Sequence, residues 1–153
     1  MLQEYNKILV AVDGSQAAEK AFKKAVAVAE RNRASLVLAH VIDTRAYQSF
    51  STFDGSIADN AREEAQNTLE QYKAEAEKDG VSNVKIVLEY GSPKIMVAKQ
   101  IPESNDVDLI MLGATGLNAV ERIFVGSVSE YVIRHADCDV LVVRTDIKNN
   151  LIK

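Results

Sequence analysis

The sequence is poor in cysteine. Cys138 is the only cysteine among 153 residues, so an internal disulfide cannot form, and no cysteine spacing typical of a zinc site is present. Its neighbours Asp137 and Asp139 are acidic, and residues 140–143 are apolar. A reactive thiol needs an electropositive setting. We therefore interpret Cys138 as a structural thiol.

Basic residues are also scarce relative to acidic ones. The chain has 18 Lys and Arg against 22 Asp and Glu, which gives a net charge of −4. Proteins that bind nucleic acids draw much of their affinity from neutralising phosphates with Lys and Arg. The balance therefore argues against a nucleic-acid partner. It leaves open a small phosphorylated ligand that is held mainly by backbone groups.

Long apolar runs are missing as well. None approaches the roughly 20 residues that a membrane-spanning helix needs, and residues 1–7 lack the regions of a signal peptide. We expect a cytoplasmic protein that does not contact a membrane. The length of 153 residues predicts a single domain over residues 1–153, which is large enough to hold a core without disulfides or metals.

Five short segments rich in Val, Ile and Leu are predicted to be strands. Several are apolar without strict alternation, which is typical of strands covered on both faces in a parallel sheet. The segments are residues 7–13, 35–43, 84–90, 107–112 and 140–144.

Segments with helical periodicity separate the strands, and start and stop signals bound them. Ser15 and Ser56 are candidate N-caps, and Ser92 precedes a proline at the first helical position. Pro102 ends or follows the third helix, and Ser127 to Glu130 fits the capping box S-x-x-E that opens the fourth. Apolar stripes support the first two helices; they are Ala18, Phe22, Ala25 and Ala29, and Ile57, Ala61, Ala65, Leu69, Tyr72 and Ala76.

The alternation of strands and helices predicts an α/β fold with a doubly wound, five-stranded parallel sheet and helices on both faces. The residues leave two strand orders open, 2-1-3-4-5 and 3-2-1-4-5. In either case a ligand binds outside the carboxyl ends of the strands. The connection over residues 44–55 lies at that edge and is either a flap or a plain surface loop.

The loop after the fourth predicted strand carries the main chemical signal. Gly113, Gly116 and Gly126 let backbone amides approach an anion, and Ser127 opens a helix whose first amides lack intrahelical partners. The hydroxyl groups of this loop add donors; they belong to Thr115, Ser127 and Ser129. We expect valine at Gly113 or Gly126 to block the phosphate path. The alternative is that these residues only turn the chain and cap the helix.

Asp13, at the end of the first predicted strand, is the second candidate. A carboxylate there binds ribose hydroxyls or holds Mg²⁺ on phosphate oxygens, or it only forms a turn before Gly14. His40 lies within an apolar strand and His135 in the last turn of a helix, and both are interpreted as structural.

At this point the chain resembles the universal stress protein family, in its nucleotide-binding branch. The motif Gly-x2-Gly-x9-Gly-Ser is complete and favours ATP binding over helix capping alone. The matching residues are 8–15 (ILVAVDGS), His40-Val41, Gly91-Ser92-Pro93, Gly113, Gly116, Gly126-Ser127 and 140–143 (VLVV).

The resemblance implies the strand order 3-2-1-4-5, ATP at the carboxyl edge with Mg²⁺ or Mn²⁺, and a homodimer through the last strand, residues 140–144. It also implies roles for individual residues. Val12 and Asp13 lie near the ribose, Val41 lies near the adenine, Leu112, Gly113, Thr115 and Gly116 follow the ribose and phosphates, and Gly126, Ser127, Val128 and Ser129 receive the phosphates.

Other phosphate-binding classes fit less well. The chain has no G-x4-G-K-[ST] run, and the turn after the first predicted strand is Asp13-Gly14-Ser15 rather than G-x-G-x-x-G. A receiver domain needs an Asp after the third strand and a Lys after the fifth, where this chain has residues 89–91 (EYG) and 144–145 (RT). Ser15 alone is thin support for FMN binding.

Two functions remain. In the first, ATP occupancy switches a stress-response module that partners recognise. In the second, the protein is a slow ATPase or an autophosphorylating phosphotransferase that uses Ser127, Ser129 or Asp13. Phosphoryl transfer needs strong charge stabilisation at the γ-phosphate, and only Arg122 lies near this loop in the sequence. The sequence therefore favours the module.

Overall fold

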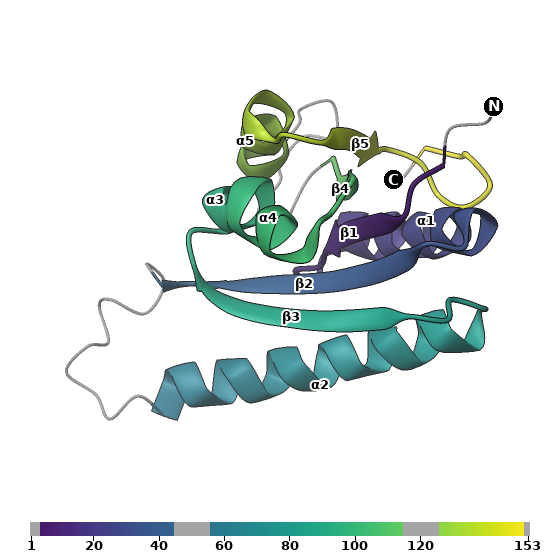
Figure 1. Cartoon of the computed structure of the whole chain (residues 1–153). Coiled ribbons are helices and arrows are strands. Elements are labelled where there is room, and N and C mark those ends of the chain that lie inside the picture. The colour runs from purple at the N-terminus through teal and green to yellow at the C-terminus, as the bar shows by residue number, and fades with distance from the viewer. Residues whose placement is uncertain (1–3, 45–55, 115–125, 152–153) are drawn as a thin grey trace.

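The computed structural model describes residues 4–44, 56–114 and 126–151, and Figure 1 shows the arrangement of their strands and helices. Strands and helices alternate along the chain, as the sequence predicts. In chain order the elements are β1 (Lys7–Ala11), α1 (Gln16–Asn32), β2 (Ser35–Asp43), α2 (Ser56–Lys78), β3 (Val84–Gly91), α3 (Pro93–Ile95), the π-helical turn η2 (Met96–Gln100), α4 (Ile101–Asn105), β4 (Leu109–Gly113), α5 (Ser127–His135) and β5 (Asp139–Val143).

The five strands form one parallel sheet of order β3-β2-β1-β4-β5. This order confirms 3-2-1-4-5 and rules out 2-1-3-4-5. The chain reverses its direction of travel across the sheet between β1 and β4, whose register pairs Ile8 with Leu109 and Val10 with Met111. A ligand crevice is therefore expected outside the carboxyl ends of these two strands.

Helices cover both faces of the sheet, which explains why the central strands are mostly apolar. Ile8 and Val10 of β1 pack in the core beneath α1 and α2, whereas Leu9 packs in the second core with η2, α4 and α5. All three side chains have no exposed surface. The predicted stripe of α1 is buried at Ala18, Phe22, Ala25 and Ala29, and Phe22 contacts Tyr72 of α2 with ring centroids 4.6 Å apart.

The helix starts differ in how well the sequence predicts them. Ser15 caps α1, because its Oγ accepts a hydrogen bond from the Ala18 amide at 3.1 Å. The capping box at Ser127 is wrong: the N-cap of α5 is Gly126, without a side-chain cap bond, and Ser127 is the first helical residue. The carboxylate of Glu130 pairs instead with Arg134 at 3.0 Å, one turn further along α5.

Pro102 lies inside a helical segment instead of ending it. The segment runs from Pro93 through α3, η2 and α4, and the Ile101 amide bonds to the Met96 carbonyl, five residues back. Proline has no amide hydrogen and crowds the preceding turn. The wider π turn accommodates it at the start of α4. The helix ends at Asp106, whose φ is +53°.

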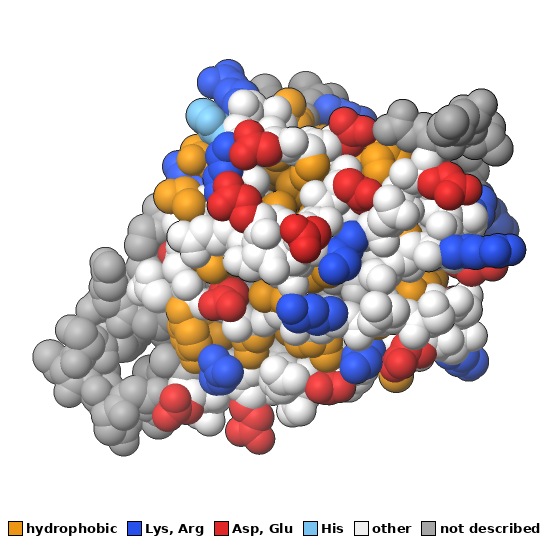
Figure 2. Space-filling view, viewed as in Figure 1, with side chains coloured by type: hydrophobic (Ala, Val, Ile, Leu, Met, Phe, Trp, Pro, Cys, Tyr) orange, Lys and Arg blue, Asp and Glu red, His pale blue; other side chains and the backbone are white. Residues whose placement is uncertain are grey.

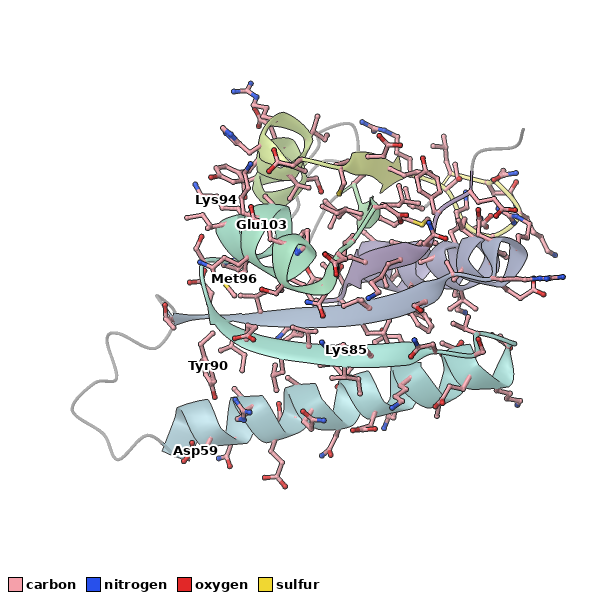
Figure 3. All side chains as sticks on the ribbon, viewed as in Figure 1. Asp59, Lys85, Tyr90, Lys94, Met96 and Glu103 are labelled. Carbon is pink, nitrogen blue, oxygen red and sulfur yellow. The ribbon has the colours of Figure 1, made fainter. Side chains whose placement is uncertain are left out.

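Polar contacts join the outer elements to the sheet. In Figure 3, Lys85 projects from β3, and its Nζ donates a hydrogen bond to Oδ1 of Asn105 in α4 at 2.7 Å. Figure 3 also shows Tyr90 between β3 and α2, where the Arg62 guanidinium lies 5.6 Å from the ring centroid. On the face shown in Figure 2, basic and acidic side chains are interspersed. None of the described helices is long and apolar enough to cross a membrane.

Candidate functional site

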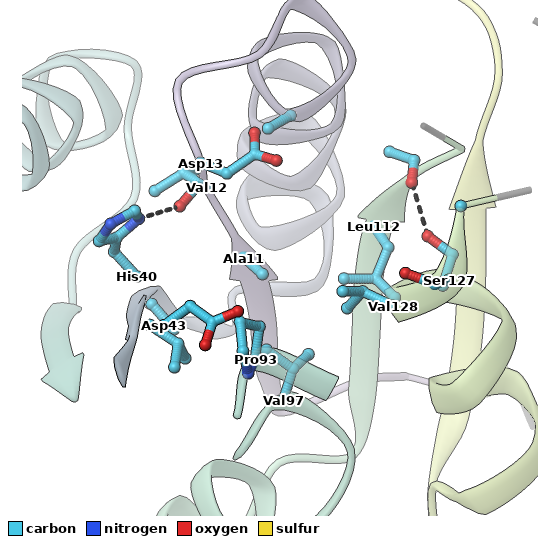
Figure 4. Close-up of a pocket in the computed structure, with 16 residues that line it drawn as sticks. Ala11, Val12, Asp13, His40, Asp43, Pro93, Val97, Leu112, Ser127 and Val128 are labelled. Carbon is cyan, nitrogen blue, oxygen red and sulfur yellow. Dashed lines mark hydrogen bonds between the residues drawn. The ribbon is translucent and has the colours of Figure 1, made fainter. Parts of the chain in front are cut away.

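A cavity of about 490 Å³ opens at the carboxyl edge of the sheet, beside the ends of β1 and β4. Figure 4 shows part of its lining, with Val12, Asp13 and His40 on one side and Leu112, Ser127 and Val128 on the other. The sequence predicts eleven site residues, of which Thr115 and Gly116 lie outside the described residues, as does Arg122. The remaining nine line this cavity; they are Val12, Asp13, Val41, Leu112, Gly113, Gly126, Ser127, Val128 and Ser129.

The sheet and the helices each supply apolar side chains to the inner part of the cavity. Val41 of β2 and Leu112 of β4 belong to the core that underlies α3 to α5. Pro93, Val97 and Val128 line the cavity from the helical segments. Apolar walls of this kind suit the faces of a planar ring, and a few polar groups then form hydrogen bonds with its edges.

Several lining residues are not among the site residues predicted from the sequence. Ala11, Ala39 and Val97 carry no chemical signal, because small and branched apolar residues occur throughout the core. His40 and Pro93 belong to the segments that resemble the family, so their positions could have identified them as site residues. Asp43 lies two residues after Val41 in a β-strand, so the alternation of side chains puts both on one face.

The turn after β1 is held by a chain of hydrogen bonds. The Val12 amide donates to the Ala39 carbonyl at 2.8 Å, and the Val12 carbonyl lies 2.6 Å from Nδ1 of His40. Oδ1 of Asp13 accepts from the Ser15 amide at 2.9 Å. Gly14 has φ +84°, a conformation that favours glycine. The turn thus carries the exposed Asp13 carboxylate from the end of the sheet to the start of α1.

Gly113 lies at the end of β4, where α1 passes close to the strand. A Cβ added to Gly113 would lie 2.7 Å from the backbone carbon and oxygen of Ala17 and 2.8 Å from its Cβ. The sequence predicted that the side chain of a valine at Gly113 would enter the phosphate path. The prediction is wrong for the Cβ atom, which would lie against Ala17 instead. The side chain would meet the backbone of α1, so packing of the helix on the strand requires glycine here.

The start of α5 faces the same cavity. Ser127 is exposed, whereas Ser129 is buried, and its hydroxyl donates to the Gly113 carbonyl at 2.8 Å. The Gly126 amide donates to the Ala114 carbonyl at 2.7 Å, which fixes the approach of the chain to the helix. The first amides of an α-helix lack intrahelical acceptors, and the helix dipole places partial positive charge there. This end of the cavity therefore suits an anion.

The charges of the described lining residues are few. Asp13 and Asp43 supply two carboxylates, His40 is the titratable base, and no Lys or Arg is among these residues. The described residues also contain no group of three or more potential metal ligands. Asp13 and Asp43 are therefore the acidic groups that the described lining offers to a ligand.

Comparisons with known proteins agree with the fold and identify the family. The sequence model of the Universal stress protein family matches residues 4–144, and the chain belongs to this family. Universal stress protein homologues from Staphylococcus haemolyticus and Staphylococcus saprophyticus are each 51% identical over 142 residues. These matches cover 93% of this chain and 86% and 85% of the relatives.

Solved structures give the same result. UspA from Lactobacillus plantarum is 35% identical with a TM-score of 0.85, covering 94% of this chain and all of that one. The protein MJ0577, whose structure was used to assign its biochemical function, is 35% identical with a TM-score of 0.83, covering 92% and 96%. A universal stress protein in complex with cAMP is 22% identical with a TM-score of 0.69, covering 92% and 98%, which shows a common fold.

Proposed function

We propose that this protein is a single-domain cytoplasmic module that binds ATP and changes its interactions in the stress response according to nucleotide occupancy. One observation carries the proposal: an apolar slot, an exposed carboxylate and the start of a helix meet in one cavity. These three features match the three parts of a nucleotide, which are a planar base, a ribose and a chain of phosphates.

The adenine lies in the slot beside Val41 in this proposal, and its edge bonds to the backbone there. Asp13, with the backbone at Val12, receives the ribose hydroxyls. The phosphates follow Leu112 and Gly113 to the amides of the segment from Gly126 through Val128 to Ser129. The cavity's size and the positions of these residues support this assignment. Thr115 and Gly116 belong to the same path by the motif alone.

Mg²⁺ or Mn²⁺ completes the proposed site. Two carboxylates and no Lys or Arg line the described part of the cavity, so the charge of a triphosphate needs another source of compensation. A divalent cation supplies it, with phosphate oxygens, water and Asp13 as ligands. Dialysis against a chelator should weaken ATP binding and leave the fold intact.

The second candidate function is slow ATP hydrolysis or autophosphorylation. The exposed Ser127 supports it, because its hydroxyl stands at the phosphate end of the cavity. Ser129 is less suited as an acceptor, since its hydroxyl is buried and bonds to Gly113. Charge stabilisation for phosphoryl transfer usually comes from Lys, Arg or metal. In a single-turnover assay with Mg²⁺, a rate above roughly 1 s⁻¹ would make the protein an enzyme in the usual range.

A thermal-shift experiment with a nucleotide panel tests ATP binding. Ligand at 100 times its Kd stabilises a protein by about 2.7 kcal/mol, and each kcal/mol shifts Tm by about 2–4 °C at this size. ATP with Mg²⁺ should therefore raise Tm by about 5–10 °C. FMN and NAD serve as controls and should leave Tm unchanged. An unchanged Tm with ATP at millimolar concentration would reject the proposed function.

A homodimer through β5 is the proposed assembly. β5 lies at the edge of the sheet, and its Leu141 is 41% exposed, so an apolar side chain stands beside strand groups that can pair with a second copy. The nearby acidic groups have partners within the subunit. Asp139 accepts from the Tyr5 hydroxyl at 2.8 Å, and Asp137 pairs with Lys99 at 2.9 Å.

A further inference from the structure

His40 makes a hydrogen bond whose direction fixes the state of its ring. It lies on β2, lines the cavity and is half-buried, with Nδ1 2.6 Å from the carbonyl oxygen of Val12 (Figure 4). A carbonyl oxygen can only accept a hydrogen bond, so Nδ1 carries a proton and donates it. The neutral ring must therefore be the Nδ1–H tautomer, with Nε2 as its acceptor nitrogen.

This bond holds the first residue beyond β1. The Val12 amide already donates to the Ala39 carbonyl at 2.8 Å, so β2 binds both polar backbone groups of Val12. The Val12 carbonyl belongs to the planar peptide unit that continues into Asp13. His40 therefore sets the rotation of that unit, and the rotation determines where the Asp13 carboxylate stands.

Beyond Asp13 the backbone itself offers little resistance to rotation. Gly14 follows directly at φ +84°, and glycine adopts both signs of φ with similar ease. The next fixed point is Ser15, whose amide bonds to Asp13 and whose hydroxyl caps α1. The carboxylate is thus held between the His40 bond on one side and the helix cap on the other.

We propose that His40 is a positioning residue of the nucleotide site. Through Val12, it holds Asp13 where its carboxylate receives the ribose hydroxyls. The inference rests on the proposed ATP-binding function and adds to it a residue that acts through the backbone of Val12. Loss of the imidazole donor should therefore weaken ligands that carry the ribose hydroxyls and spare ligands that lack them.

Isothermal titration of four proteins with two nucleotides tests this prediction. The proteins are wild type, His40→Phe, His40→Asn and the control His135→Phe, which changes an exposed histidine of α5 that lies outside the cavity lining. The ligands are ATP and 2′,3′-dideoxy-ATP, each with Mg²⁺. For His40→Phe, we expect Kd to rise roughly two- to tenfold for ATP, the effect of one lost hydrogen bond, and less than about twofold for the dideoxy analogue.

The asparagine variant separates positioning from general damage. Its side-chain amide nitrogen occupies nearly the place of Nδ1 and can donate to Val12, so ATP affinity should return to within about twofold of wild type. Equal losses for both ligands in His40→Phe, or no loss for either, would overturn the inference. A wild-type protein that binds neither ligand would reject the proposed function itself, and this inference with it.

Nitrogen NMR of the wild-type protein provides a test that needs no variant. In its neutral form, the His40 ring should show a protonated Nδ1 and an unprotonated Nε2. An Nε2–H tautomer would overturn the inference, because Nδ1 could not then donate to Val12. This measurement also decides the matter if His40→Phe fails to fold.

Discussion

Gly113 shows that one residue can serve a binding motif and a packing contact together. In the sequence it belongs to a glycine pattern that indicates phosphate binding, and in the structure it lines the cavity. Its missing side chain, however, makes room for Ala17 of α1. The sequence predicted the glycine's place at the site. It could not predict the approach of α1, because that contact joins segments almost 100 residues apart.

Replacing Gly113 by valine should destabilise the protein whether or not nucleotide is present. Overpacking against a backbone typically costs about 1–3 kcal/mol, which corresponds to a fall in Tm of roughly 2–12 °C at 2–4 °C per kcal/mol. Ser127→Val is the matched control at an exposed position of the same cavity and should change Tm by little. A folded Gly113→Val protein with wild-type Tm would contradict the close contact with Ala17.

Cys138 should react slowly with thiol reagents in the folded protein. Burial raises the pKa of its thiol, and the negative charges of Asp139, Asp108 and Asp137 raise it further. A higher pKa leaves less thiolate at pH 8, and the thiolate is the reactive form. Modification by a chromogenic disulfide should therefore be slower than for free cysteine. The urea-unfolded chain is the control and should react at the rate of free cysteine; equal rates for the folded and unfolded protein would show that the thiol is not shielded.

At the scale of elements, sequence patterns predict helices better than they predict helix ends. Ser15 and the buried stripe of α1 agree with the prediction, because both depend on residues within a few positions of each other. The start of α5 at Ser127 also agrees, but its predicted cap does not, because Gly126 is the N-cap and its amide bonds to the Ala114 carbonyl. The π turn that accommodates Pro102 inside the helical segment has no simple sequence pattern.

The cap of α1 gives a prediction with an internal control. Ser15→Ala should lower the free energy of unfolding by about 1 kcal/mol, because the Ala18 amide loses its acceptor. Ser15→Asp keeps an acceptor and should recover most of the stability. Ser92→Ala, at the N-cap of α3, should change little, since Ser92 makes no side-chain cap bond. Urea unfolding measures all three, and equal losses for Ser15→Ala and Ser92→Ala would exclude a specific capping role.

At the scale of the whole molecule, the residues predicted an α/β fold but left the strand order open. Both candidate orders have the same elements and the same buried strands, so local patterns cannot separate them. The resemblance to the universal stress protein family selected 3-2-1-4-5, and the structure confirms it. The order also determines the site, because only this arrangement places the ends of β1 and β4 side by side.

The proposed dimer predicts a specific change in assembly. Leu141→Lys places a charge on the exposed edge strand and should convert the protein to monomers, since burying an unpaired charge is costly. Ile133→Lys is the matched control, because Ile133 is 51% exposed but lies on α5 and not on the edge strand β5. Sedimentation velocity measures the mass. A wild-type monomer, or a dimer that survives Leu141→Lys, would rule out assembly through this residue.

The pairing of β1 with β4 has a consequence for folding during translation. The Lys7 amide bonds to Asp108, 101 residues later in the chain. A nascent chain that has emerged only as far as β3 can pair its first three strands. In that partial sheet β1 is an edge strand, because β4 has not yet been synthesised. The ligand cavity cannot form until α5 has been synthesised, because residues of α5 line it. Nucleotide binding can therefore stabilise the folded state only after translation is nearly finished.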